Sequence, residues 1–199
     1  MRQVVALLLA AGRSSRYGSD KLAAPLRIDG HATTVLAATL QALQAACSEV
    51  VAVTRPGSVH TDALRARGVT VIEATHADQG MGASLAAGAA WVQSQRPGAA
   101  CLVMLADLPF VRATSIAAVR DQLAAGQAFV VPRYRGERGH PVGFGAAQVG
   151  ALTALAGDQG AKAVLQAHAQ ELHFLDIDDP GILHDVDTPA RLHAAPGSP

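Results

Sequence analysis

The feature that most constrains the fold is a run of six apolar residues near the N-terminus, Val4 to Leu9. The run has strand length and lacks alternating polar residues, which is typical of a parallel strand buried on both faces of a sheet. A second such run, Ala100 to Leu105, predicts another central strand. Helices must then cover both faces of the sheet, so the two runs favour an α/β fold.

Further segments alternate in the same way between strand-like and helical patterns over the first two-thirds of the chain. The other predicted strands are Glu49 to Thr54, Val69 to Glu73, Ala128 to Arg133, Leu172 to Asp176 and an edge strand, Ile182 to Asp187. The predicted helices are Thr33 or Thr34 to about Ala46, His60 to Arg67, Ser84 to Trp91, Thr114 to Ala125, Ala146 to Leu155, Ala161 to Gln170 and a short one after Thr188-Pro189. This alternation predicts a three-layer α/β/α fold with a mostly parallel, Rossmann-like sheet.

Length and composition narrow the functional class. The 199 residues favour a single domain, 1–195, followed by a frayed, disordered tail, 196–199. Sixteen basic and sixteen acidic side chains balance, so no global positive field favours nucleic acid or a membrane surface. No apolar run reaches the ~20 residues of a spanning helix. Cys47 and Cys101 form no CxxC pair and are expected to be reduced core thiols of a cytoplasmic protein, with no zinc site.

The first strand leads into a loop of small and basic residues. These residues are Ala10, Ala11, Gly12, Arg13, Arg16 and Lys21. Small residues let a ligand approach the backbone, successive N–H groups can form an anion nest, and the cations suit a triphosphate. The loop matches neither the P-loop spacing nor GxGxxG, and an ordinary surface turn with solvated arginines is the alternative. Its place beyond the carboxyl end of a strand favours a nucleotide site.

Carboxylates occur at two positions suited to a magnesium site. Asp107 follows the second central run directly, within LADLP, where ligands bind in open α/β sheets. Asp185 and Asp187 stand one residue apart in HDVDTP, so on a strand they would share one face and require a compensating cation. Magnesium bound with a nucleotide uses one or two carboxylates plus phosphate oxygens. Turn or helix capping is the alternative for each acid.

Glycine-containing segments supply the remaining candidates. Gly80 to Ser84 opens a predicted helix whose N–H groups could bind an anion or a carbonyl, with plain capping by Ser84 as the alternative. Thr54, at the end of a strand, could face a base. The stretch Arg138 to Phe144 combines two glycines with Arg138 and His140, and Gly157 to Lys162 forms another glycine turn.

The segment LAAGRSSRYGSDKLAAPL resembles the signature LAAGxSxRMGxxKLLxPL of the MobA-like nucleotidyltransferases. It is most similar to the molybdenum cofactor cytidylyltransferase branch (MocA type), because Ala11 stands where the guanylyltransferases usually read LAGG. Tyr17 replaces the usual methionine. LADLP, HDVDTP, GMGASL, RGHPV and GDQGAK also resemble family segments, so the resemblance runs from about Val4 to Leu192.

The resemblance implies a nucleotide-diphospho-sugar transferase-like fold and transfer of CMP from CTP to the terminal phosphate of molybdopterin. It implies Mg²⁺ (or Mn²⁺) on Asp107 and Asp187, with Asp185 as second choice, and catalytic roles for Arg16, Lys21 and Asp107. The implied nucleotide-binding residues are Ala10, Ala11, Gly12, Arg13, Arg16, Lys21, Thr54, Gly82 and Ser84. The implied acceptor-binding residues are Arg138, His140 and Lys162, although Lys162 replaces an arginine. A molybdenum hydroxylase or its insertion chaperone would be the partner.

Three other functions remain open on the sequence. The chain could be a nucleotidyltransferase for another nucleotide or another phosphorylated acceptor, or a non-catalytic carrier that holds molybdopterin for insertion. A dinucleotide-binding oxidoreductase is disfavoured, because the first turn lacks GxGxxG and Thr54-Arg55 stand where an acid would end the second strand.

Overall fold

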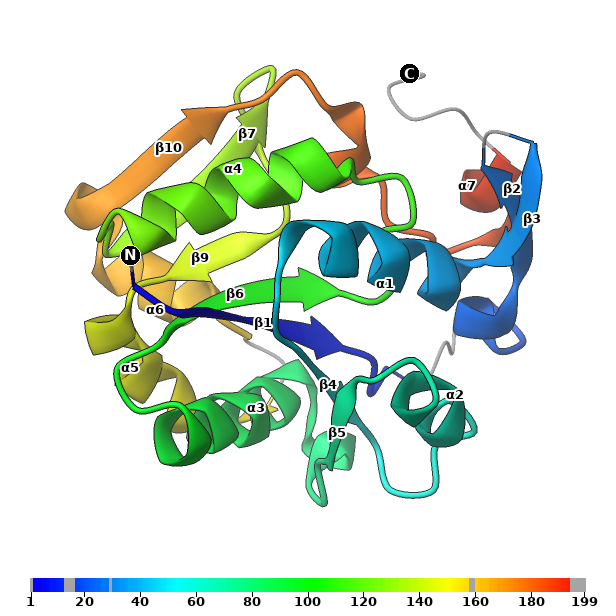
Figure 1. Ribbon diagram of the computed structural model, residues 1–199, viewed down its shortest axis with the longest axis horizontal. Helices are drawn as coiled ribbons and strands as arrows, with labels where there is room; N and C mark the ends of the chain where they lie inside the picture. The colour runs from blue at the N-terminus through cyan, green and yellow to red at the C-terminus, as the bar shows by residue number, and fades with distance from the viewer. Residues whose placement is uncertain (1, 13–16, 29, 158–159, 194–199) are drawn as a thin grey trace.

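Strand β1, Val4–Leu9, lies at the centre of an eight-stranded sheet (Figure 1). The computed structural model describes residues 2–12, 17–28, 30–157 and 160–193. The strands follow the order β10-β7-β9-β6-β1-β4-β5, and β8 pairs with β7 alone. The other strands are β4 Val50–Thr54, β5 Thr70–Glu73, β6 Ala100–Leu105, β7 Phe129–Tyr134, β8 Glu137–Arg138, β9 Val142–Phe144 and β10 Leu172–Asp176.

Helices cover both faces of this sheet. They are α1 Val35–Ala46, α2 Thr61–Arg65, α3 Met81–Gln95, α4 Ala113–Ala124, α5 Val149–Thr153, α6 Lys162–Ala167 and α7 Pro189–His193. Helices α1 and α4 pack on one face, and α3, α5 and α6 pack on the other (Figure 1). Short 3₁₀ turns, η1 Lys21–Ala23, η2 Ala77–Gln79, η3 Ala146–Gln148, η5 Ala169–Glu171 and η6 Pro180–Leu183, occupy several connections. The predicted three-layer α/β/α fold is confirmed.

Strand β1 is apolar throughout because its two faces belong to two different cores. Alternate residues of a strand point to opposite faces, so Ala6 and Leu8 pack in the core under α1 and α4. Leu7 packs instead in the core under α3 and α5. The strand pairs in parallel with β4 on one side and β6 on the other, with Ala6 opposite both Val50 and Leu102.

The sheet is mixed, because β9 runs antiparallel to both of its neighbours, β6 and β7. From the sequence, Tyr134 to Phe144 is a glycine-rich, charged stretch in which no strand is predicted. Val142 and Phe144 are nevertheless buried, and a Cβ on Gly143 would lie 2.9 Å from the Leu123 side chain. The glycine therefore allows α4 to approach the sheet closely. The same residue weakened the strand pattern in the sequence.

A second, two-stranded sheet also escaped prediction. Strand β2, Pro25–Ile28, pairs with β3, His31–Thr34, and Gly30 between them has φ of +81°. The sequence signal was the Asp29-Gly30 dipeptide, which favours tight hairpin turns. The hairpin leads directly into α1, where the Thr34 hydroxyl accepts the N–H of Ala37 at 3.3 Å. Thr34 is thus the helix cap that the sequence offered alongside Thr33.

The predicted edge strand Ile182 to Asp187 is wrong. The chain forms the turn η6 there and then continues without strand pairing through residues 184–187. Asp179, whose side chain is 2% exposed, caps this turn by accepting the Gly181 N–H, and it also accepts the backbone N–H of Arg112 and the hydroxyl of Ser115. These bonds fasten the segment to the start of α4 rather than to a sheet edge.

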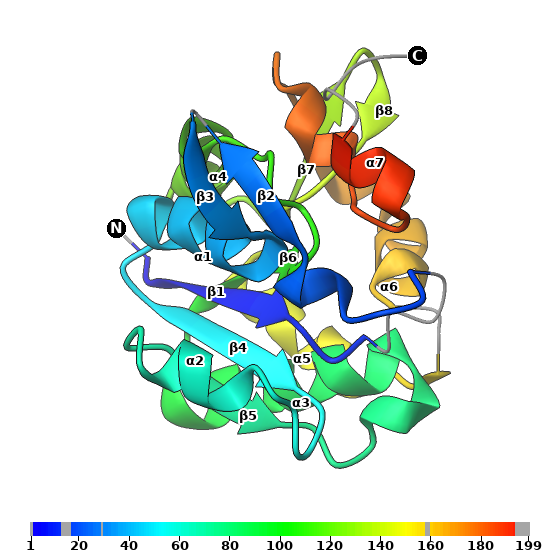
Figure 2. The same cartoon turned by 90° about the vertical axis from the view of Figure 1, so that its right-hand side faces the viewer.

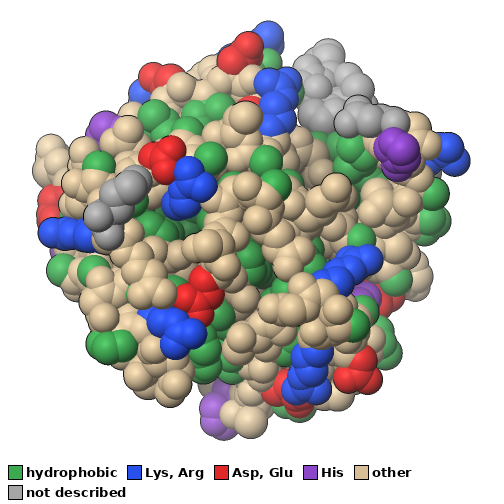
Figure 3. Space-filling model, viewed as in Figure 1, with side chains coloured by type: hydrophobic (Ala, Val, Ile, Leu, Met, Phe, Trp, Pro, Cys, Tyr) green, Lys and Arg blue, Asp and Glu red, His purple; other side chains and the backbone are tan. Residues whose placement is uncertain are grey.

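Cys47 and Cys101 are buried and free of disulfides; burial raises the pKa of the Cys47 thiol to about 11 and that of Cys101 further. Basic and acidic side chains are intermixed on the face in Figure 3. Within the described ranges, no helix has the length and apolarity to cross a membrane. The predicted tail, 196–199, lies outside the described residues.

Candidate functional site

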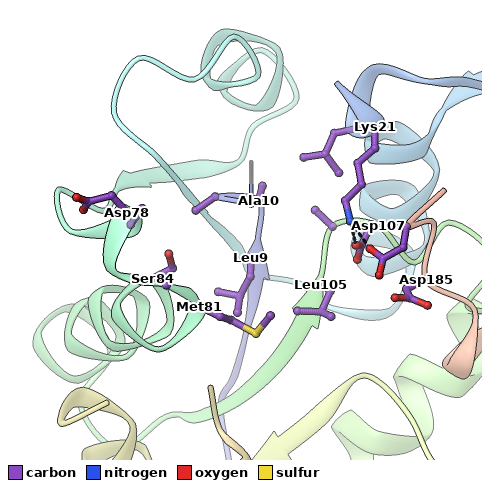
Figure 4. Close-up of a pocket in the computed structure, with 16 residues that line it drawn as sticks. Leu9, Ala10, Lys21, Asp78, Met81, Ser84, Leu105, Asp107 and Asp185 are labelled. Atoms are coloured by element: carbon purple, nitrogen blue, oxygen red, sulfur yellow. Dashed lines mark hydrogen bonds and ion pairs between the residues drawn. The ribbon is translucent and has the colours of Figure 1, made fainter. Parts of the chain in front are cut away.

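A cavity of ≈ 460 Å³ opens at the carboxyl ends of β1 and β6 (Figure 4). This is the edge of an open α/β sheet where ligands bind. The residues that line it come from the ends of the two strands, η1, the segment before α3 and the start of that helix, and the segment before α7. They are Leu9, Ala10, Ala11, Gly12, Lys21, Leu22, Ala77, Asp78, Gly80, Met81, Ser84, Leu105, Ala106, Asp107, Asp185 and Asp187.

The ammonium group of Lys21 joins two of these acids. Lys21 Nζ lies 2.5 Å from Asp107 Oδ2 and 2.9 Å from Asp187 Oδ1. Burial lowers the pKa of Lys21, but the two carboxylates outweigh that effect and raise its pKa above the usual value. Lys21 therefore carries a positive charge at neutral pH. Acids from the middle and from the C-terminal region thus meet at Lys21.

Backbone hydrogen bonds fix the relative positions of these segments. The Ala106 N–H donates to the Leu9 carbonyl at 3.1 Å, which holds the exit of β6 beside the exit of β1. The Val186 N–H donates to the Asp107 carbonyl at 2.9 Å, which brings the C-terminal acids to the same place. Residues from both ends of the chain therefore meet beside the cavity.

Lys21 is itself held by a short turn with a side-chain cap. Asp20 Oδ1 accepts the N–H of Leu22 at 3.1 Å and so starts η1. The other oxygen of Asp20 lies 2.8 Å from His60 Nε2, on the loop that follows β4. Sequence reasoning missed both residues, because Asp20 stands at an unspecified position of the first signature and His60 belongs to no motif. Their contact links the Lys21 turn to the neighbouring strand exit.

The carboxylate of Asp107 has capacity for a further positive ligand. Its Oδ1 atom is buried and has no hydrogen-bond partner, and an unpaired buried acceptor is energetically costly. Across the described ranges, no three His, Cys, Asp or Glu side chains form a ready cluster for a metal ion. A site with two carboxylates suits Mg²⁺ or Mn²⁺ better when phosphate oxygens complete the coordination. The residues present therefore fit a divalent ion that arrives with a nucleotide.

The two candidate acids of HDVDTP have different partners. Asp187 faces Lys21 together with Asp107, whereas Asp185 Oδ1 lies 3.1 Å from Arg191 Nη2. Burial, followed by the nearby charge of Asp187, raises the pKa of Asp185. The geometry accordingly favours Asp187 over Asp185 as the partner of Asp107.

Helix α3 points its N-terminus at the cavity. Gly80 caps it with φ of +114°, no side chain caps the first turn, and no acidic residue lies in that turn. Its first N–H groups and partial positive charge suit an anion or a carbonyl oxygen. The prediction that Gly80 to Ser84 opens a helix is confirmed. Capping by Ser84 is wrong, because Ser84 lies within the first turn, although it does line the cavity.

Gly82, which is predicted to contact the nucleotide, packs closely against a neighbouring backbone segment. It does not line the cavity, and a Cβ there would lie 2.8 Å from the carbonyl oxygens of Ala156 and Gly157. The absence of a side chain lets the 156–157 backbone pack against the start of α3.

We therefore expect Gly82→Ala to lower the free energy of unfolding by about 1–3 kcal/mol, because the added methyl overlaps backbone atoms that cannot rotate away. Urea denaturation followed by circular dichroism measures the change. Gly12→Ala is the matched control, since nothing lies within 4 Å of a Cβ at Gly12. Equal stability of the two variants would contradict the packing role.

Thr54 and the first loop are also predicted to contact the nucleotide. The Thr54 side chain is fully buried, and its hydroxyl lies 3.5 Å from that of Thr61, so the predicted contact with a base is not available in this structure. Ala10, Ala11 and Gly12 line the cavity as expected. Arg13 and Arg16 lie outside the described residues.

The predicted acceptor residues do not gather in the cavity. The Arg138 guanidinium lies over the Phe174 ring at 4.9 Å on the outer hairpin, and Lys162 is exposed at the start of α6. The sequence placed them by motif alone, which carries no orientation. His140 lies deeper: its N–H donates to the Ile182 carbonyl at 3.0 Å. Burial lowers the pKa of His140, and the negative charge of Asp107 partly opposes this.

The chain is similar to a known protein family and to several solved structures. Residues 6–172 match the family described as MobA-like NTP transferase domain. Rv0371c from Mycobacterium tuberculosis H37Rv is 28% identical, with a TM-score of 0.77 over 96% of this chain and 95% of that one. A second structure of Rv0371c, in complex with manganese, gives a TM-score of 0.71 over 95% of each chain.

Two further structures extend the comparison. The nucleotidyl transferase Mth528 from Methanothermobacter is 25% identical, with a TM-score of 0.77 over 95% of this chain and 94% of that one. A 4-diphosphocytidyl-2C-methyl-D-erythritol synthase shares the fold alone, at 17% identity and a TM-score of 0.69 over 97% and 96%. The fold is thus of the nucleotide-diphospho-sugar transferase type. No curated protein sequence matches this chain.

Proposed function

Because this chain belongs to the family of MobA-like NTP transferase domains and is therefore a nucleotidyltransferase, we propose that it transfers CMP from CTP to the terminal phosphate of molybdopterin. The products are a cytosine dinucleotide form of the cofactor and pyrophosphate. The observation that supports this best is the cluster of Lys21, Asp107 and Asp187 at the mouth of the cavity. The choice of CTP rests on Ala11 in LAAG, which resembles the cytidylyl branch.

Positioning and charge do most of the work in such a transfer. An oxygen of the acceptor phosphate forms a bond to the α-phosphorus of CTP while the bond from that phosphorus to the bridging oxygen breaks. The electron pair leaves with pyrophosphate. The attacking phosphate is already ionised at neutral pH, so the protein needs no general base. Lys21 would then stabilise the negative charge that develops on the phosphates.

A divalent ion is part of the proposal. Asp107 and Asp187 would hold it, and the buried, unpaired Oδ1 of Asp107 is the atom that supports this. When bound, the ion supplies positive charge to the phosphate oxygens of the nucleotide. The manganese complex of Rv0371c agrees with Mg²⁺ or Mn²⁺ in this role. The N-terminus of α3 and the loop at Ala10 to Gly12 would contact the nucleotide from the other side of the cavity.

The direct test compares nucleotides. With Mg²⁺ present, CTP should raise the melting temperature more than GTP or ATP does, because a ligand that binds only the folded state stabilises it. With molybdopterin added, only CTP should release pyrophosphate, and mass analysis should find the cytosine dinucleotide product. Turnover with another nucleotide or phosphorylated acceptor would favour the second candidate, a related nucleotidyltransferase. Pterin binding without pyrophosphate release would favour a carrier.

A further inference from the structure

A second cavity of ≈ 320 Å³ lies between the hairpin β7–β8 and the C-terminal segments η6 and α7, on the side of the molecule seen in Figure 2. Of its lining residues, only His184 belongs to the motifs compared above, as the first residue of HDVDTP. The lining residues are Tyr134, Arg135, Glu137, Pro180, Leu183, His184 and Arg191. The lining thus contains the guanidinium groups of Arg135 and Arg191, the rings of Tyr134 and His184, and the single carboxylate of Glu137. This composition suits a ligand with negative charge and flat, polar surfaces.

This second cavity adjoins the first through a shared wall. Asp185 lines the first cavity, while the preceding residue, His184, and the ion-pair partner of Asp185, Arg191, line the second. His184 Nε2 donates to the Arg191 carbonyl at 2.7 Å, so the wall and α7 are held together. Consecutive residues of the C-terminal segment, His184 and Asp185, therefore border the two cavities.

A transfer reaction needs room for two substrates at once. The first cavity is of a size that holds one nucleotide-sized ligand. A third cavity of ≈ 220 Å³, beside Arg55, shares Ala11, Ala77 and Asp78 with the first and so extends the nucleotide side. The second cavity lies instead beside the C-terminal segment that carries Asp185 and Asp187.

Arg135 lies in a tight turn of the β7–β8 hairpin, at the second cavity. Arg135 has φ of +50° and Gly136 has φ of +83°, the pattern of a tight hairpin turn. Positive φ is costly for most residues and least so for Gly, Asn and Asp. The Arg135 guanidinium lies 5.1 Å from the centre of the Tyr134 ring, which orients it at the mouth of the cavity.

We propose that this second cavity binds the end of the acceptor remote from its reacting phosphate, and that Arg135 and Arg191 bind an anionic or carbonyl-rich group there. The inference rests on the proposed function and adds Arg135 to the acceptor-binding residues that the family resemblance implies. The acceptor must then carry a second group rich in hydrogen-bond acceptors, beyond the phosphate that reacts.

Arg135→Asn tests this cleanly, because asparagine tolerates positive φ and removes only the cation. At saturating CTP and Mg²⁺, we expect its KM for molybdopterin to rise about tenfold, the loss of one charged hydrogen bond, with kcat and the KM for CTP unchanged. Arg67→Gln, which removes an exposed cation beyond α2, is the matched control and should behave as the unchanged protein does.

The outcomes separate the two proposals. Equilibrium titration with molybdopterin alone is run alongside the kinetics. If the unchanged protein shows no turnover but binds the pterin, and Arg135→Asn weakens that binding, the site stands and the proposed function fails. If turnover occurs and Arg135→Asn leaves the KM for molybdopterin unchanged, the site fails and the function stands. An equal rise of the KM for molybdopterin in Arg67→Gln also overturns the site.

Discussion

Replacing Asp107 with asparagine is expected to lower kcat for pyrophosphate release from CTP by about 10³-fold or more. Asparagine keeps the shape of the side chain but removes the charge that faces Lys21 and the proposed divalent ion. The backbone carbonyl of Asp107 still accepts the Val186 N–H, so the loop should keep its position. Pyrophosphate release at saturating CTP, molybdopterin and Mg²⁺ measures the effect, and circular dichroism checks the fold.

Asp62→Asn serves as the control for this variant, since that carboxylate is 98% exposed on α2. It should retain full activity. An Asp107→Asn protein that folds and still turns over within tenfold of the unchanged rate would exclude Asp107 from the reaction. A variant that fails to fold would be replaced by Asp187→Asn, whose loss of charge falls on the other side of Lys21.

Replacing Lys21 with methionine should change catalysis and metal binding in opposite directions. We expect kcat to fall by about 10²–10³-fold, because a cation that stabilises the transferring phosphates is gone. Without nucleotide, however, Mn²⁺ should bind more tightly, by about tenfold or more. The ammonium group that lies between Asp107 and Asp187 no longer competes with the ion for the two carboxylates.

Mn²⁺ titration monitored by electron paramagnetic resonance measures the affinity, and pyrophosphate release measures kcat. Arg67→Gln removes one positive charge at an exposed position and so controls for net charge alone. Mn²⁺ affinity that stays equal in Lys21→Met and the unchanged protein would show that the two acids do not bind the metal. A decrease in kcat with no gain in Mn²⁺ affinity would leave Lys21 as a phosphate ligand only.

The sequence predicted most of the parallel half of the fold because its signals are local. An unbroken apolar run such as Val4–Leu9 has few alternatives to a central strand. The same reasoning placed Asp107 at a strand exit, which is where the cavity lies. The same reasoning did not predict β9, because Gly143 interrupts the strand pattern. A glycine is required there by the close contact with Leu123 of α4, and sequence patterns do not show contacts between residues so far apart in the chain.

The sequence also could not show in which direction individual side chains point. The edge strand at 182–187 looked plausible from Ile182 and Val186, yet the buried cap made by Asp179 decided the conformation. Arg138 and Arg135 lie three residues apart on one hairpin, and only the structure distinguishes the one over Phe174 from the one at a cavity. Motif spacing identifies a segment of this kind but not which of its residues faces a ligand.

The delivery of Asp187 by the last part of the chain has a consequence for biosynthesis. The first loop and β6 leave the ribosome early, but the acid that completes their charge cluster follows after most of the domain. A nascent polypeptide that stops short of the Val186–Asp107 hydrogen bond holds half of the acidic pair. Under the proposed function, a product that ends before residue 186 would lack both this hydrogen bond and Asp187, and it would be inert.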